Sequence, residues 1–202
     1  MPLSRSTRLW QTLLVIPKLG FANIGRVIGY RLLSSIGYYR WRLPIGTSFA
    51  GPFFVRDGAA CRLVDPCHTL SPADRVLSGE LPFYGHCWRR LGNPPEWPSR
   101  DDKGHWSRLD EFAQGDVKDI WEPSRFAGLL LLAHAAAVRG EKRYEDACEA
   151  WMTSWVSAHP WNTGRVWKCG QEVALRLMAA TLAADLLERH VGMRPASAMF
   201  RF

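Results

Sequence analysis

The sequence has few cysteines, and its apolar runs are short. Five cysteines occur in 202 residues, none in a CxxC pair, so no disulfide framework is indicated. Cys61, Cys67 and His68 match no standard zinc spacing, and we expect neither a metal nor a cofactor. Near the N-terminus, the longest charge-free apolar run extends from Leu9 to Pro17, well short of the roughly 20 residues that a membrane-spanning helix needs. Without a clear cleavage site after this run, no signal peptide is expected either.

Acidic residues are missing from the first part of the chain. Residues 1–56 hold eight basic residues and no acid, whereas the rest of the chain has 18 basic and 19 acidic residues. The formal net charge of +7 therefore comes from one N-terminal region. A nucleic-acid-binding domain would carry its basic face on the folded body, so we expect no nucleic-acid partner.

Residues 1–43 form a basic N-terminal arm that contains a predicted amphipathic helix. Apolar residues recur there at helical spacing between basic ones: Phe21, Ile24, Val27 or Ile28, and Leu32. Such a helix more commonly docks on its own domain. The alternative is that it lies on a membrane surface, so peripheral membrane contact through residues 1–43 remains open.

The rest of the chain has the composition of a folded domain. Apolar residues make up 47% and charged residues 22%, which excludes disorder. Ten tryptophans are more than a plain core needs, and flat aromatic faces are typical of carbohydrate sites. Residues 44–120, rich in Gly, Pro and aromatics, are predicted to form an irregular segment packed on a helical body. A short helix is expected within it, with Ser71 as N-cap and Pro72 at the first position.

Helical patterns dominate residues 121–191. One helix is predicted from Pro123 to about Arg139, with Gly140 as its stop. A second is predicted from Glu141 or Lys142 to about Ala158, with an apolar stripe on one face formed by Tyr144, Cys148, Trp151, Met152 and Trp155. A third covers about 170–190. The third is apolar almost all round, which is typical of a helix buried between neighbours. Because no alternating strand pattern appears, we predict an all-α fold of antiparallel helix hairpins, followed by an atypical tail over 192–202.

Two groups of residues combine aromatic and charged side chains. In the first, Trp121, Glu122 and Arg125 lie at the predicted start of a helix, where Glu122 favours the positive end of the helix dipole. In the second, Glu172 and Arg176 are four residues apart on one helix face and follow two further candidates, Trp167 and Gln171. Each group is either a structural ion pair or a sugar subsite, in which aromatic rings cover the sugar and a guanidinium binds a carboxylate.

An ordered series of motifs carries a family resemblance. The motifs are DRVL (74–77), FYG (83–85), LGNPPEW (91–97), HW (105–106), GDVK (115–118), WEPSRF (121–126) and WKCGQE (167–172). Together with LGFAN (19–23) and YRL (30–32), this series resembles the N-terminal part of the heparinase II/III-like family of polysaccharide lyases. The resemblance covers about residues 19–190 and implies a partial (α/α) toroid, normally followed by a β-sandwich domain.

The family reaction is β-elimination on a uronic-acid-containing polysaccharide. The resemblance implies that an Asn or a His pairs with the uronate carboxylate, while a Tyr or a His moves the proton. The family's Asn-His pair normally follows the helix that corresponds to residues 170–190, but this sequence contains no Asn-His dipeptide. No catalytic residue is therefore assigned to this chain.

These observations set the expected function and partners. We expect the N-terminal toroid portion of a lyase in a truncated chain that binds acidic polysaccharide without cleaving it. Its helix faces would then be completed by a missing C-terminal part or by another chain. Alternatives are a non-catalytic membrane-surface or glycan-associated module and a fragment that retains lyase activity. Without a clear signal, the default expectation is a cytoplasmic protein, and the resemblance implies the periplasm as the alternative.

Overall fold

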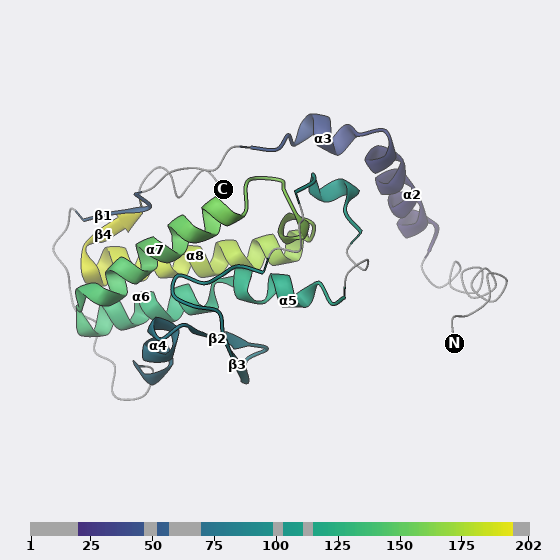
Figure 1. The fold of residues 1–202 in the computed structure, drawn as a ribbon. Helices are drawn as coiled ribbons and strands as arrows, with labels where there is room; N and C mark the ends of the chain where they lie inside the picture. Colours follow the sequence, from purple (N-terminus) through teal and green to yellow (C-terminus); the bar gives the residue numbers. More distant parts are fainter. Residues whose placement is uncertain (1–19, 47–51, 57–69, 99–102, 111–114, 196–202) are drawn as a thin grey trace. The chain divides into compact units, whose positions relative to one another are not determined.

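Three long helices form the main layer of the structure: α6 (Ala127–Arg139), α7 (Lys142–Ala158) and α8 (Gly170–Val191). They come from a computed structural model that describes residues 20–46, 52–56, 70–98, 103–110 and 115–195. Helix α6 contacts both α7 and α8, and the three helices lie side by side (Figure 1). Gly140 ends α6 in the left-handed conformation, with φ of 64°, so the chain reverses into α7 at once. The predicted stop is confirmed.

The centre of the core is one face of α7. Five of its side chains are completely buried and follow the predicted helical stripe: Tyr144, Cys148, Trp151, Met152 and Trp155. The apposed helix α6 is lined with small residues, because Ala133, Ala135 and Ala136 are also fully buried. Small side chains on α6 leave room for the two large indoles of α7, so packing is dense where these helices meet.

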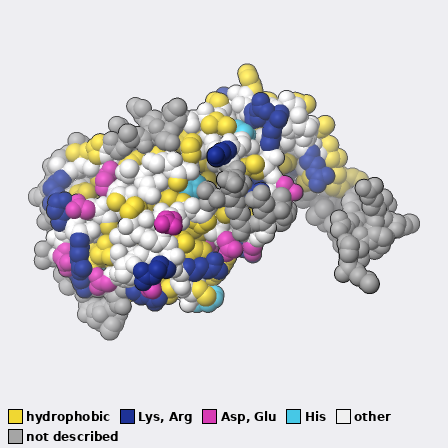
Figure 2. Space-filling model, in the orientation of Figure 1, with side chains coloured by type: hydrophobic (Ala, Val, Ile, Leu, Met, Phe, Trp, Pro, Cys, Tyr) yellow, Lys and Arg dark blue, Asp and Glu magenta, His cyan; other side chains and the backbone are white. Residues whose placement is uncertain are grey.

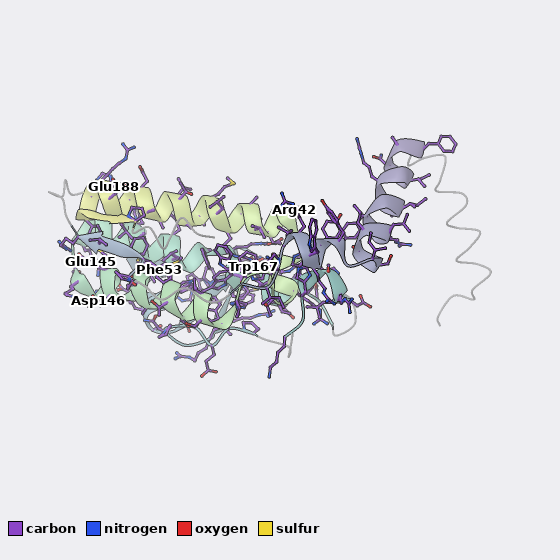
Figure 3. The ribbon with its side chains drawn as sticks, turned by 90° about the horizontal axis from the view of Figure 1, so that it is seen from above. Arg42, Phe53, Glu145, Asp146, Trp167 and Glu188 are labelled. Carbon is purple, nitrogen blue, oxygen red and sulfur yellow. The ribbon has the colours of Figure 1, made fainter. Side chains whose placement is uncertain are left out.

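Helix α8 is buried on one side only. Ala183 and Leu187 are fully or almost fully covered, and α8 contacts α6 more extensively than any other element. On its opposite face, however, Leu177, Met178 and Leu182 are 57%, 61% and 54% exposed. In Figure 3 a row of α8 side chains points away from the other helices. The prediction of a helix buried between neighbours is therefore wrong for these residues, since no described element packs on that face.

Two short antiparallel strand pairs correct the all-α prediction. Strands β1 (Phe54–Arg56) and β4 (Met193–Pro195) pair with each other, which places the start of the supposed atypical tail in a regular element. Strands β2 (Glu80–Phe83) and β3 (Cys87–Arg90) form a hairpin. Each strand has only three or four residues, too few to show a convincing alternating pattern. The fold nevertheless remains mainly helical, as predicted.

Helix α4 (Leu70–Leu77) packs against α6 and begins before the predicted cap, so that Ser71 lies inside the helix. Its Asp74 accepts a hydrogen bond of 2.6 Å from the Tyr144 hydroxyl of α7. Burial and this carboxylate raise the pKa of Tyr144 to about 12. The phenol therefore keeps its proton and ties the segment before residue 120 to the helical layer.

The helix predicted from Pro123 is interrupted. Residues Pro123–Arg125 form a 3₁₀ turn, η2, and Phe126 then adopts a left-handed conformation with φ of 64° before α6 begins. A short helix, α5 (Lys118–Trp121), precedes this turn. Two further 3₁₀ turns, η1 (Trp106–Arg108) and η3 (Arg165–Trp167), complete the described connections.

The chain divides into two compact units, Met1–Pro44 and Ile45–Phe202. The described part of the first unit contains α2 (Phe21–Ser35) and α3 (Tyr38–Arg42), which contact each other across Gly37. No residue of either helix is buried. Among the described residues, no helix is both long and apolar enough to cross a membrane.

Gly128 provides a test of the α6–α7 packing. A Cβ atom there would lie 2.9 Å from Cζ3 of Trp151, a contact that requires the fully buried indole to move. We expect Gly128→Ala to lower the free energy of unfolding by about 1–3 kcal/mol, the usual range for overpacking a core. Gly170→Ala is the matched control, because a Cβ at the start of α8 meets no atom within 4 Å. Denaturant unfolding of both variants tests this, and equal stabilities would contradict it.

Candidate functional site

The two charged groups singled out in the sequence meet at the N-terminal end of α8. Arg125 of η2 donates from Nε and Nη2 to the two carboxylate oxygens of Glu172, each at 2.7 Å. Its Nη1 also donates to Glu122, three residues earlier. The side chains of Glu172 and Glu122 are only 6% and 10% exposed, against 31% for Arg125. The guanidinium thus joins residues that lie 47 positions apart in the chain.

The backbone around η2 explains how this cluster is positioned. Pro123 and Ser124 are buried, so the turn is anchored in the core while Arg125 points toward α8. Glu122 ends α5 rather than beginning a long helix, so the predicted dipole interaction is replaced by direct contacts. One of them comes from the β2–β3 turn, where the Tyr84 amide donates to Glu122 Oε1 at 2.7 Å.

Arg125 is paired with two protein carboxylates, which accept three hydrogen bonds from its guanidinium. The hydrogen bonds to Glu172 are the main reason that the pKa of Arg125 is raised above its ordinary value. Two carboxylates thus face one guanidinium. These contacts match the structural ion pair that the sequence offers as one alternative for this group. The sugar-subsite alternative stays a prediction.

Arg176 is a buried cation. Its side chain donates from Nε to the Ser124 carbonyl at 2.9 Å and from Nη2 to the Val166 carbonyl at 3.1 Å. The guanidinium carbon lies 4.5 Å from the ring centre of Trp155 and 5.4 Å from that of Trp167. Burial lowers the pKa of Arg176, but a guanidinium still carries its charge at neutral pH.

For Glu172 and Arg176 the sequence left two alternatives open, a mutual ion pair or a sugar subsite. Glu172 instead pairs with Arg125, and the hydrogen bonds of Arg176 go to backbone carbonyls. Sequence spacing could not reveal these acceptors, because every residue has a carbonyl group. The sequence also missed the role of Trp155 as the closest aromatic partner of Arg176.

The remaining predicted residues lie around the cluster. Trp121 is half-buried and donates from its indole nitrogen to the Arg165 carbonyl at 2.9 Å. Trp167, at the N-terminal end of α8 in Figure 3, is also half-buried and lines a small, mainly apolar pocket of about 60 Å³ together with Arg176. Gln171 is exposed on the first turn of α8. The structure thus places all seven predicted residues in one region, although Arg176 is buried within it.

A polar surface that sequence reasoning missed lies beside the cluster. Asp119 of α5 accepts hydrogen bonds from Arg89 at 2.9 Å and from the Tyr84 hydroxyl at 3.4 Å. Burial, Asp119 and Asp116 raise the pKa of Tyr84, so this phenol is not poised to act as a base. Within the described residues there is no group of three or more metal-binding side chains. The Cys61, Cys67 and His68 group lies outside the described residues.

Comparisons with known proteins do not extend this description. No family model, no curated protein and no solved structure matches the chain.

The ion pairs of Arg125 should contribute to the stability of the folded protein. Arg125→Ala leaves the Glu172 carboxylate buried without its bidentate partner, and we expect it to lower the free energy of unfolding by about 1–3 kcal/mol. The double variant Arg125→Ala/Glu172→Gln should recover part of this loss, because the uncompensated charge is gone. Arg189→Ala removes an exposed pair with Asp185 and should have no measurable effect. Unfolding curves that coincide for Arg125→Ala and the unsubstituted protein would refute the prediction.

Because His159 is buried, we expect the protein to lose stability in acid. Burial lowers its pKa from 6.5 to about 4, while its Nδ1 contacts the Trp155 carbonyl at 3.1 Å. Between these two values the unfolded chain binds a proton that the folded chain does not, so the free energy of unfolding falls as the pH drops from 7 to 4. Over this whole pH range, titration of His159 lowers the free energy of unfolding by on the order of 3 kcal/mol.

The matched variants for this test are His159→Phe and His86→Asn. His159→Phe preserves a ring against Trp155, whose ring centre lies 5.0 Å from that of His159, and removes the titrating group. Denaturant unfolding across this pH range should give a flatter profile for His159→Phe. His86 is exposed, so His86→Asn should retain the original slope. An unchanged slope in His159→Phe would count against neutral burial of His159.

Proposed function

We propose that this chain is the N-terminal helical portion of a heparinase II/III-like polysaccharide lyase, and that it binds acidic glycan without cleaving it. The observation that carries the proposal is the Glu122–Arg125–Glu172 cluster. Its members belong to the WEPSRF and WKCGQE motifs, which carry the family resemblance, and they meet although Arg125 and Glu172 lie 47 positions apart. Spatial convergence of these two motifs is what a common site requires.

The arrangement of helices is compatible with part of an (α/α) toroid. Helices α6 and α7 form an antiparallel hairpin, and α8 adds a third helix to the same layer. The exposed apolar stripe on α8 is the kind of face that a further helix hairpin would cover. We propose that the next hairpin of the ring, from this protein or from another chain, packs on Leu177, Met178 and Leu182.

The glycan would be recognised by the groups that remain accessible around the cluster. Trp121 and Trp167 offer half-buried indole rings, and Gln171 offers an exposed amide that hydrogen-bonds hydroxyl groups. Because Arg125 is paired with two carboxylates and Arg176 is buried, we propose another cation for the uronate carboxylate. Lys118 is exposed on α5, the same short helix that carries Trp121, and we assign it this role.

Cleavage is not part of the proposal. The sequence contains no Asn-His dipeptide, and the Tyr84 phenol holds its proton more tightly than an ordinary tyrosine. Among the described residues we assign none to move the C5 proton, so we propose binding alone.

Calorimetric titration with uronic-acid-containing oligosaccharides tests the proposal. We expect saturable binding by the full chain, with no rise in the ultraviolet absorbance of unsaturated product. Lys118→Ala and Gln171→Ala, both at exposed positions, should each weaken binding about tenfold, which corresponds to about 1.4 kcal/mol.

Glu188→Gln is the control for this experiment. Glu188 is exposed near the other end of α8, so its substitution should leave the affinity unchanged (Figure 3). Circular dichroism verifies that each variant remains folded. Absence of binding to every uronate polymer, or equal affinity of all three variants, would refute the proposed surface.

A further inference from the structure

The first unit combines exposed apolar side chains with charge of one sign. Residues 20–43 contain four arginines and no acidic residue. In the second unit, by contrast, the face drawn in Figure 2 intersperses basic and acidic side chains. An unbalanced positive charge beside exposed hydrocarbon requires a partner that is both anionic and apolar.

Helix α2 places its apolar residues on one face. Phe21, Ile24, Ile28 and Leu32 follow each other at spacings of three, four and four, so they form one stripe. Phe21, Ile28 and Leu32 are 85%, 53% and 59% exposed. Arg26 lies on the opposite face, where its Nη1 donates to Asn23 at 3.0 Å. Arg31 follows Ile28 by three residues and so borders the stripe, which places a cation at the edge of the exposed apolar face.

Helix α3 adds exposed aromatic residues to the first unit. Gly37, with φ of 81°, turns the chain between α2 and α3. Trp41 is then 77% exposed and Tyr38 is 38% exposed, and Arg40 and Arg42 flank Trp41. Tryptophan and tyrosine beside arginine form the side-chain set that sits at the boundary between lipid headgroups and acyl chains.

We propose that residues 20–43 bind the surface of an anionic membrane, independently of glycan binding. The apolar stripe of α2 and the Trp41 ring enter the acyl boundary, while Arg31, Arg40 and Arg42 face the lipid phosphates. A nucleic acid would neutralise the charge but offers no hydrocarbon to cover the stripe. A second copy of the chain would cover the stripe but would bring two acid-free, arginine-rich faces together.

Vesicle co-sedimentation of the full chain tests this inference. We expect binding to vesicles that contain phosphatidylglycerol, weak binding to pure phosphatidylcholine, and release at high salt, since exposed charges are screened. Ile28→Glu/Leu32→Glu should abolish binding. Arg40→Gln/Arg42→Gln should lower the partition coefficient at least about tenfold.

Leu177→Glu is the matched control, because it also places a charge on an exposed apolar position but in the second unit. This variant should sediment like the unsubstituted protein. If the intact chain fails to bind anionic vesicles, or if Ile28→Glu/Leu32→Glu binds as well as the intact chain, the inference is wrong. Glycan titration of the same variants separates the two proposals, since substitutions in α2 should leave glycan affinity unchanged.

Discussion

A guanidinium held away from water organises the centre of the second unit. Arg176 can remain charged there only because two carbonyl oxygens and two indole rings replace its hydration. Those partners come from η2, η3 and α7, so one buried cation determines how three segments meet α8. The left-handed Phe126 and the interruption before α6 place the Ser124 carbonyl where Arg176 requires it. The backbone of η2 and η3 thus supplies the carbonyl acceptors that a buried guanidinium needs.

The second constraint is the difference in side-chain size between the helices. α6 presents alanines and Gly128 to its neighbours, whereas α7 presents Trp151 and Trp155, so large indoles occupy the space that small residues leave. Helix α8 packs on α6 through one face and leaves Leu177, Met178 and Leu182 exposed. An apolar stripe of this kind is consistent with a helical layer that continues beyond α8 through a partner.

Helix positions were predictable from the sequence because their signals are local. The Tyr144–Trp155 stripe and the stop at Gly140 depend only on spacing and on one glycine. The strands were not predictable, because β1 finds its partner in β4 near the other end of the chain and β2 contains Pro82, which argues against a strand. The seven candidate residues do converge, but the partner of Glu172 depends on a turn at Phe126 that no propensity indicates.

The ion pairs of Arg125 affect how the candidate site would bind a ligand. A guanidinium that already binds two carboxylates gains little from a third, but it holds Glu122 and Glu172 in fixed positions before a ligand arrives. Little ordering is then needed on binding, which favours affinity for a ring-shaped ligand. In the proposed complex, the carboxylates of an acidic glycan lie away from Glu122 and Glu172 and close to Lys118, with the sugar rings over Trp121 and Trp167.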